Sequence, residues 1–582
     1  MKRLLVYLKD YKKECIFAPL FKMLEASFEL LIPLVIAAII DTGIGEGAGK
    51  VYIAKACLLL FALAVVGLIS SVTAQFFAAK AAVGYATKLR SALFSHLQSL
   101  SYSEIDTIGT SSMITRMTSD VNQTQTGVNM VLRLFLRSPF VVFGAMIMAF
   151  TIDVKSAMSF VIAIVLLLIV VGGITWISIP MMKRVQGSLD EVLLVARENL
   201  IGIRVIRAFC KEEEETQRFA KKNAHLTTEQ KRAGSVSALM NPLTYIIINF
   251  AVVYLIWTGA VQVDHGILTQ GQVVALYNYM SQILVELIKL ANLIVTTNKA
   301  LASANRIADV FEIKTSMQWR GEDTSSVSAE ASESEASIVE FKDVCLSYAG
   351  GGDEALSNID FSIKRGQTVG IIGGTGSGKT SLVNLIPRFY DATGGEVLVD
   401  GRNVRDYTAQ ELEEKIAVVP QKAVLFKGSI ADNLRWGKAD ATEEELEAAV
   451  RAAQATDVVK SKGGLSGKVT QGGKNLSGGQ KQRLTIARAL VKQAPVLILD
   501  DSASALDMAT DAALRAAIRK LSYHPTVFIV SQRTNAIMDA DQIIVLDDGR
   551  IVGIGTHEEL LDNCLVYKEI YESQFKKEVA AK

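Results

Sequence analysis

Apolar stretches of membrane-spanning length recur through the first half of the chain, whereas short β-branched runs alternate with helical patterns in the second half. Before residue 300, six stretches are long and apolar enough to cross a bilayer as helices. We therefore predict a transmembrane domain of six helices over residues 1–312. The predicted spans cover roughly residues 16–40, 54–78, 134–152, 156–179, 240–262 and 273–298.

The connections between these spans differ in length and in charge. Residues 79–133 and 180–239 are long, polar and rich in lysine and arginine near the membrane ends, whereas the other connections are short and hold few basic residues. By the positive-inside tendency, we expect both long loops, the N-terminus and everything after residue 300 to be cytosolic in a multi-pass protein of the cell membrane. Both loops keep helical periodicity without turn signals, which favours helices that continue past the bilayer over a separate soluble insertion.

Several ionisable residues fall inside the predicted spans. Lys22, Glu25 and Glu29 lie in the first span, and Glu286 and Lys289 lie in the sixth. Facing lipid would cost each of them a few kcal/mol, so we expect them to face protein or a water-filled cavity. Two interpretations stay open at this point. The residues form i,i+3 pairs or reach toward the cytosolic face, or they line a substrate path.

A change of composition separates the spans from the rest of the chain. Residues 313–337 are dominated by serine, glutamate, alanine and threonine, which is typical of a flexible linker. After them, β-branched runs such as Thr368–Ile372, Val496–Leu499 and Thr526–Val530 alternate with helical patterns, which predicts an α/β domain with a mainly parallel sheet over residues 338–582. The predicted fold is thus a six-helix α transmembrane domain, with helices extended into the cytosol, followed by an α/β domain.

Composition agrees with a membrane protein and excludes other classes. Half of the residues are hydrophobic and the mean hydropathy is +0.29, which is high for a soluble protein. The net charge of +1 argues against a nucleic-acid partner. The five cysteines are scattered without C-x-x-C spacing, so we expect reduced thiols and neither a metal site nor a disulfide framework.

A glycine-rich loop follows the apolar run 368–372 and precedes a helical pattern. This strand–loop–helix context is the one that a phosphate-binding P-loop requires, because the glycines let backbone N–H groups turn toward phosphate oxygens at a helix N-terminus. We expect the lysine to reach the β- and γ-phosphates and the threonine hydroxyl to bind Mg²⁺. The loop predicts a nucleoside triphosphate site, formed by Gly373, Gly374, Thr375, Gly376, Ser377, Gly378, Lys379, Thr380 and Ser381.

Two further motifs accompany the loop. The apolar strand Val496–Leu499 ends in Asp500, an arrangement in which the carboxylate holds Mg²⁺ at the carboxyl end of the strand. A serine and two glycines precede a helix that begins near Lys481, and backbone N–H groups at that N-terminus make a second phosphate site. The residues of this second motif are Leu476, Ser477, Gly478, Gly479 and Gln480.

The combination of the P-loop, the signature Leu476–Gln480 and the Asp500 strand resembles the nucleotide-binding domain of ATP-binding cassette (ABC) proteins. With six spans and two long loops before it, the whole chain resembles a half-transporter of the ABC exporter type. The resemblance implies ATP and Mg²⁺ as cofactors, and a dimer in which each ATP lies between one chain's P-loop and the other chain's signature. It also implies short coupling helices near Ile105–Ser112 and Phe209–Arg218.

The same resemblance implies roles for further residues of this chain. Tyr348 would stack on adenine, and Gln421 would sense Mg²⁺ and the γ-phosphate, so that Thr380, Gln421 and Asp500 would form the metal site. The loop from Ser504 to Asp507 would cross between the two ATP sites.

Two positions depart from the family pattern. After Asp500 the family usually has glutamate, whereas this chain has Asp501, which is shorter by roughly one bond of 1.5 Å. The family's switch histidine is replaced by Gln532, which cannot carry a proton. One interpretation is that both substitutions are tolerated in a working site. The other, which we favour, is an impaired site in a heterodimer, whose partner supplies the catalytic glutamate and the switch histidine.

The resulting hypothesis is ATP-driven export of small amphipathic compounds, of the multidrug efflux type, by one subunit of a heterodimeric ABC transporter in the lipid bilayer. The complex would hydrolyse ATP, and this chain alone would be a weak ATPase. The alternatives are a lipid or peptide exporter subunit, and a regulatory nucleotide-binding partner of another transporter.

Overall fold

The computed structural model describes residues 2–320, 337–348, 354–502 and 504–579. Most of the predicted linker therefore lies outside the described residues. The chain separates into two compact units, Met1–Ser95 with Met113–Glu312, and His96–Ser112 with Ile313–Lys582. Each unit is described by itself below.

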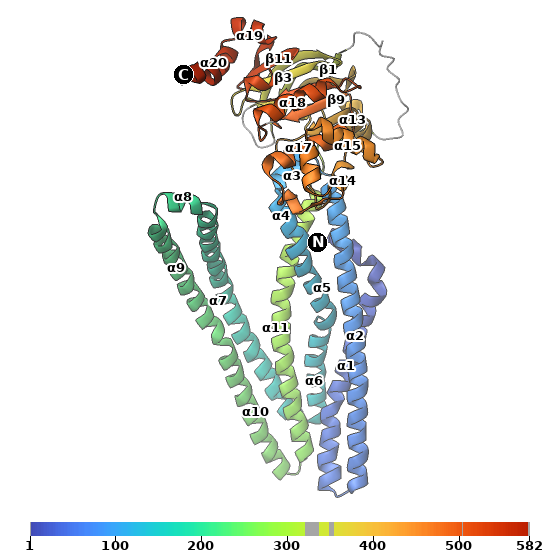
Figure 1. The fold of residues 1–582 in the computed structure, drawn as a ribbon. Helices are drawn as coiled ribbons and strands as arrows, with labels where there is room; N and C mark the ends of the chain where they lie inside the picture. Colours follow the sequence, from blue (N-terminus) through green and yellow to red (C-terminus); the bar gives the residue numbers. More distant parts are fainter. Residues whose placement is uncertain (1, 321–336, 349–353, 503, 580–582) are drawn as a thin grey trace. The chain divides into compact units, whose positions relative to one another are not determined.

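The first unit is a bundle of long helices (Figure 1). Within the described residues, six helical stretches are long and apolar enough to cross a membrane, which confirms the predicted transmembrane domain. The longest uninterrupted helix has 49 residues and would be about 74 Å long, more than twice the thickness of a bilayer's hydrocarbon core. The predicted continuation of helices beyond the spans is therefore confirmed. The helices are α1 (Lys12–Ala38), α2 (Lys50–Gln98), α4 (Thr110–Thr115), α5 (Val121–Leu134), α6 (Arg137–Ile152), α7 (Val154–Ile201), α8 (Ile203–Ala208), α9 (Glu212–Ala238), α10 (Met240–Asp264) and α11 (Gln270–Glu312).

Helix α11 is the element against which most of this bundle packs, because it contacts α1, α5, α6 and α10. Close approach is possible where side chains are small: a Cβ added at Gly127 of α5 would lie 2.2 Å from the Cβ of Ala300 in α11. Helices α7, α9 and α10 form a hairpin that contacts α6 and α11 through α7 and α10, while its α8 end lies apart from α5 and α11 in Figure 1. The short helix at that end is α8. It precedes Phe209–Arg218, the segment near which the resemblance implies the second coupling helix.

Charged side chains inside the bundle are paired. Lys22 donates to Glu25 at 2.5 Å, and Lys289 donates to Glu286 at 2.8 Å, so both i,i+3 pairs are present. The sequence reading did not include Arg137, at the start of α6. Its Nη1 lies 2.5 Å from Oε1 of Glu286, and its Nη2 lies 2.6 Å from Oε2 of Glu29.

The second unit holds the sheets. One sheet has the strand order β12-β11-β3-β10-β9-β6, in which neighbours are parallel except β12 with β11. Another has the order β2-β1-β4-β5 and is antiparallel. Strands β7 and β8 form a small antiparallel pair. The strands are β1 (Ser337–Leu346), β2 (Leu356–Lys364), β3 (Thr368–Gly373), β4 (Gly394–Val399), β5 (Arg402–Asn403), β6 (Ile416–Val419), β7 (Gly428–Ser429), β8 (Lys468–Val469), β9 (Val496–Asp500), β10 (Thr526–Val530), β11 (Gln542–Asp547) and β12 (Arg550–Gly555).

The helices of this unit are short compared with those of the bundle. They cover the parallel sheet or connect its strands, and the predicted α/β domain with a mainly parallel sheet is confirmed. The helices are α3 (Tyr102–Ile108), α12 (Lys379–Leu385), α13 (Ala409–Lys415), α14 (Ile430–Leu434), α15 (Glu443–Ala452), α16 (Thr456–Ser461), α17 (Gly478–Val491), α18 (Met508–Arg519), α19 (His557–Asn563) and α20 (Leu565–Val579).

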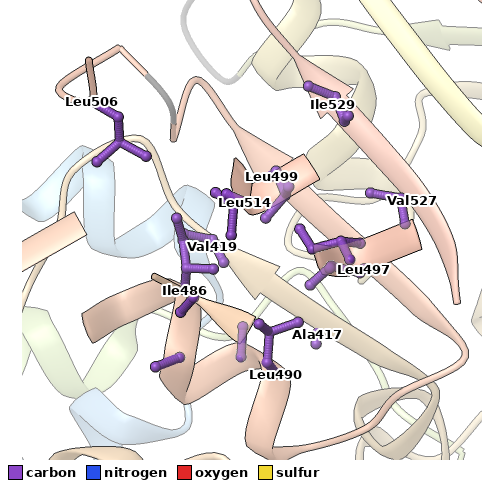
Figure 2. Packing of buried hydrophobic residues seen from close by; sticks show 14 of the residues in the cluster. Ala417, Val419, Ile486, Leu490, Leu497, Leu499, Leu506, Leu514, Val527 and Ile529 are labelled. Atoms are coloured by element: carbon purple, nitrogen blue, oxygen red, sulfur yellow. The ribbon is translucent and has the colours of Figure 1, made fainter. Parts of the chain in front are cut away.

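The parallel sheet is apolar on both faces, because successive side chains of a strand point to opposite sides. Leu497 and Leu499 of β9 belong to a core that includes Ile486 and Leu490 of α17 (Figure 2). Alternate residues of the same strand, such as Ile498, belong to a second core on the side of the antiparallel sheet. All five residues of β9 and of β10 are buried, which explains why both strands are continuous apolar runs.

The segment 96–112 belongs to this second unit through helix α3. The ring of Tyr102 lies 4.8 Å from that of Phe389, centroid to centroid, and the Tyr390 hydroxyl donates to Asp106 at 2.6 Å. The predicted first coupling helix at 105–112 therefore overlaps a helix that contacts the α/β domain, although this helix begins at Tyr102.

Removing the guanidinium of Arg137 should destabilise the bundle. The Arg137→Met change leaves Glu286 buried without its main counter-ion, and breaking a buried pair from one side costs about 3–5 kcal/mol. We expect a lower thermal unfolding midpoint for the detergent-solubilised full-length chain, measured by circular dichroism. Lys289→Met is the matched control, because Lys289 is more exposed and Glu286 would keep Arg137 and Ser138. An Arg137→Met midpoint no lower than that of the control would contradict this reasoning.

Candidate nucleotide-binding site

The candidate site lies at the carboxyl edge of the parallel sheet. Strand β10 pairs in register with both of its neighbours, so that Val530 lies opposite Asp500 of β9 and Ile371 of β3. Residues that follow these strands therefore meet at one edge, as the ends of parallel strands do in doubly wound folds. The residues brought together come from the glycine loop, from Asp500 and Asp501, and from the segment after β10.

A cavity of about 380 Å³ opens at this edge. It is lined mainly by residues that the sequence motifs had singled out, although these come from segments up to 184 positions apart, from 348 to 532. The lining consists of Tyr348, Ala355, Thr375, Gly376, Gly378, Lys379, Thr380, Ser381, Gln421, Asp500, Asp501, Val530, Ser531 and Gln532.

The glycine loop adopts a backbone that needs its glycines. Gly378 has φ of 93°, a left-handed conformation, and a Cβ there would lie 2.8 Å from Leu356 and 2.9 Å from the carbonyl of Ala355. The ammonium of Lys379 donates to the carbonyls of Gly373 (2.9 Å) and Gly374 (2.5 Å). Burial lowers the pKa of Lys379, while the charges of Asp501 and Asp500 act in the opposite direction. A phosphate group in the cavity would offer this buried ammonium a stronger acceptor than the carbonyls.

The residues predicted to bind Mg²⁺ fit that ion. The Thr380 hydroxyl donates to Oδ1 of Asp500 at 3.1 Å, so two hard oxygen ligands lie side by side, as Mg²⁺ requires. Burial raises the pKa of Asp500, and the like charge of Asp501 adds to the rise. A cation at this point would relieve both effects. Gln421 lines the same cavity and can add its amide oxygen.

Tyr348 lies where the cavity meets a second tyrosine. Its hydroxyl donates to the Ser381 hydroxyl at 2.9 Å, and its ring stands edge-on to that of Tyr390, 5.1 Å away and at 90°. Edge-to-face packing leaves one face of a ring available. The position is therefore compatible with the predicted stacking on a base.

The two departures from the family pattern both line the cavity. Asp501 accepts a hydrogen bond from the Gln421 side chain at 3.4 Å, a long contact. The backbone carbonyl of Gln532 accepts from Gln574 of α20 at 2.8 Å, and Gln574 in turn accepts from the N–H of Thr534 at 3.0 Å. Among the described lining residues there is no histidine. His524 stands before β10, at the opposite end of that strand.

The signature motif lies elsewhere in the described fold. The Ser477 side chain accepts from the N–H of Gln480 at the start of α17, in a capping box. None of the residues 476–480 belongs to the lining that the structure describes for the cavity. A Cβ added at Gly479 would lie 3.0 Å from the carbonyl of Ala505, which places the signature beside the predicted inter-site loop.

The inter-site loop is held from both ends. Ser504 donates through its hydroxyl to the carbonyl of Asp501 at 2.9 Å, and Asp507 caps α18 by accepting from the N–H of Thr510 at 2.9 Å. Arg533 reaches the carbonyl of Ser504 at 3.3 Å. The residues after β9 and after β10 are thus linked to each other.

Sequence reasoning missed several residues of this region, including Ala355 in the cavity lining. Ser531 could have been found, because it directly follows an apolar strand at the predicted edge. Tyr390 and Gln574 carry no local signal in the sequence, because each contacts a residue 42 positions earlier. The ring of Tyr390 packs against Tyr348, and the side chain of Gln574 donates to the backbone carbonyl of Gln532.

Two family models and several known proteins match the chain. The family model "ABC transporter transmembrane region" matches residues 15–287, and the model "ABC transporter" matches residues 356–504. The chain is 35% identical over 580 residues to the uncharacterized ABC transporter ATP-binding protein YfiB of Bacillus subtilis, covering 99% of each chain. It is 33% identical to the putative multidrug export ATP-binding/permease protein YgaD of Bacillus subtilis, covering 99% of this chain and 98% of that protein.

A lipid transporter and a solved structure are also similar. The ATP-dependent lipid A-core flippase of Desulfotalea psychrophila is 34% identical over 83% of each chain. The structure of a bacterial Atm1-family ABC exporter with ATP bound matches with a TM-score of 0.78 and 23% identity, covering 97% of this chain and 98% of that one. At this level of sequence identity, the structural similarity shows a shared fold only.

Replacing the loop lysine should weaken nucleotide binding. Lys379→Met takes away the ammonium that would pair with the phosphates, and we expect affinity for radiolabelled ATP to fall by about 100-fold, the equivalent of two charge-assisted hydrogen bonds. Lys520→Met is the control, because Lys520 is exposed at the end of α18. Equal ATP affinity in the two variants would show that the nucleotide binds elsewhere.

Proposed function

The chain belongs to the ABC transporter family as an exporter-type half-transporter, and from this premise we propose that it is one subunit of a heterodimer that exports small amphipathic compounds. The observation that carries the heterodimer is the cavity's composition: Asp501 and Gln532 occupy the two positions that handle protons, while the signature is unaltered.

In this proposal the cavity binds ATP. The glycine loop and Lys379 hold the phosphates, Tyr348 stacks on adenine, and Thr380, Asp500 and Gln421 hold Mg²⁺, which neutralises phosphate charge when bound. Support comes from the convergence of these side chains on one cavity and from the buried Lys379.

We propose that ATP hydrolysis at this site is slow, because the groups that handle protons are altered. A general base must reach the attacking water, and Asp501 is one methylene shorter than the usual glutamate. Its long contact with Gln421 fits a carboxylate that stops short of the phosphate region. Gln532 offers no proton and no positive charge to the phosphate. ATP therefore stays bound here and biases the closed state, and the complex turns over at the partner's site.

The partner completes the pair. Its signature covers this chain's ATP, and this chain's Leu476–Gln480 covers the ATP on the partner's P-loop. The Ser477 capping box keeps the N–H groups at the start of α17 oriented for that role. The partner supplies the catalytic glutamate and the switch histidine.

The arrangement in the membrane follows from charge. We place the N-terminus, both long loops and the ABC domain in the cytosol, because lysine and arginine gather in those segments. We assign residues 1–312 to the transmembrane domain, 313–337 to the linker and 338–582 to the ABC domain.

For the substrate, YgaD is named a putative multidrug exporter, which favours amphipathic compounds. The lipid A-core flippase makes a lipid the second candidate.

Co-purification tests the heterodimer. Two versions of this chain with different affinity tags, expressed together in the source organism, should not purify with each other. Each should bring down a second ABC half-transporter that has glutamate and histidine at the positions of Asp501 and Gln532, identified by mass spectrometry. Recovery of both tags in one complex with rapid ATP turnover would show a working homodimer instead.

A single-turnover experiment on the isolated complex tests the impaired site. Radiolabelled ATP bound at this chain's site should persist, because Asp501 replaces the catalytic glutamate and Gln532 replaces the switch histidine. The double change Asp501→Glu with Gln532→His should speed its conversion to ADP by about 100-fold, in line with the worth of general-base catalysis. Asp562→Glu with Gln410→His, at exposed positions, is the matched control. If the unaltered complex and both double variants converted bound ATP to ADP at equal rates, the proposal that this chain's own site is impaired would be refuted.

A further inference from the structure

We propose that a cavity between α1 and α11 binds the positively charged group of an amphipathic organic cation, with Glu29 as its counter-ion. The proposal rests on the export function above and names the charge of its substrate. The cavity measures about 270 Å³ and lies inside the helical bundle, with Val141 of α6 completing its wall.

The two carboxylates of this cavity are unequal. Glu286 is nearly fully buried and accepts from Arg137 at 2.5 Å, from Lys289 at 2.8 Å and from Ser138 at 2.8 Å. Its hydrogen-bonding capacity is thus largely used by the protein. Among the described contacts, the Glu29 carboxylate accepts only from Arg137, through Oε2, and its side chain remains 38% exposed. Glu29 is therefore the carboxylate with an oxygen available to a ligand.

The cations nearby do not compete for the same space. The side chain of Arg137 is 7% exposed and does not belong to the described lining. Lys289 belongs to the lining, but its ammonium is bound to Glu286. Arg137 and Lys289 together balance the charges of Glu29 and Glu286, so the preference for a cation depends on which polar atoms are still available at the cavity and not on net charge.

Helix α1 adds an acceptor at the same place. Pro33 has no N–H, so the carbonyl of Glu29, four residues earlier, loses its helical hydrogen bond. That carbonyl receives only a long contact of 3.5 Å from the Gln282 amide. Oε1 of Gln282 is buried and has no hydrogen-bond partner among the described residues. Two under-used acceptor oxygens therefore lie at this cavity beside the Glu29 carboxylate, although the amide of Asn278 and the hydroxyl of Ser281 also belong to its lining.

This chemistry selects a cation with an apolar body. A positive group can approach Glu29 without displacing an existing bond, while aliphatic side chains such as Ile32 and Val285 contact the rest of the molecule. An anion would meet the Glu29 carboxylate and unpaired acceptor oxygens, and would have to take Lys289 from Glu286. A charged side chain in a membrane-spanning helix costs free energy, and Glu29 is a charged side chain of this kind that lies at a cavity.

Equilibrium dialysis of the detergent-solubilised full-length chain tests the proposal with tritiated tetraphenylphosphonium, and with tetraphenylborate as an anion of the same shape. Glu29→Gln should weaken tetraphenylphosphonium binding about tenfold, the loss of one ion-pair contact, and should not weaken tetraphenylborate binding. Glu25→Gln is the matched control, because Glu25 lies one turn earlier on α1, binds Lys22 and is outside the described lining.

Each other outcome overturns the proposal. Unchanged tetraphenylphosphonium binding in Glu29→Gln would exclude Glu29 as counter-ion, and equal weakening of both ions would reduce the site to an apolar surface. Tighter binding of tetraphenylborate than of tetraphenylphosphonium by the unaltered chain would assign the site to anions. ATP affinity and the thermal midpoint show that each variant is folded. The assay needs neither a partner nor hydrolysis, so its result is independent of the tests of the heterodimer and of the impaired site.

Discussion

The parallel register of β3, β10 and β9 is the constraint on which the nucleotide site depends. Pairing of Val530 with both Asp500 and Ile371 brings the ends of β9 and β10 level, and β3 continues two residues beyond them to Gly373, so that the segments after all three strands share one edge. Close packing in the two cores maintains that register, since a shift of one residue would exchange the side chains that fill one core with those that fill the other. The site is therefore a consequence of the two cores.

A register held by the cores leaves the residues at the edge free to vary. Asp501 and Gln532 stand at strand ends where the backbone is fixed by neighbours: the Asp501 N–H donates to the carbonyl of Val530 at 3.0 Å, and the Gln532 carbonyl is held by Gln574. None of these bonds involves the side chains that differ from the family pattern. Both substitutions can thus alter proton transfer while the fold and the phosphate-binding loop remain intact, which is how a subunit can lose one chemical step alone.

The parts that could be predicted from the sequence are those with local signals. Apolar runs of spanning length, the glycine loop and Asp500 after an apolar strand all placed their residues in the right kind of element, because periodicity and turn chemistry act over a few residues. The resemblance implied a short helix near Phe209–Arg218, whereas the short helix between α7 and α9 is α8, Ile203–Ala208; Gly202 and the acidic run 212–215 mark the end of α7 and the start of α9. Arg137 was overlooked as a partner, since Glu29 and Glu286 lie 108 and 149 positions from it. Such pairings are set by helix packing and have no local pattern.

Stability alone does not explain why the bundle keeps the charges around Arg137. Well-packed apolar residues of similar volume would often be as stable as a buried ion pair, or more so. The arrangement has another property: Glu286 takes one arm of the guanidinium and two further donors, while the other arm reaches Glu29 without saturating it. One buried cation thereby pairs with two carboxylates within the apolar helices, and leaves an oxygen of the more exposed carboxylate facing a cavity. Packing alone gives no reason for that open oxygen, and it is the atom to which the proposed cation site assigns the role of counter-ion.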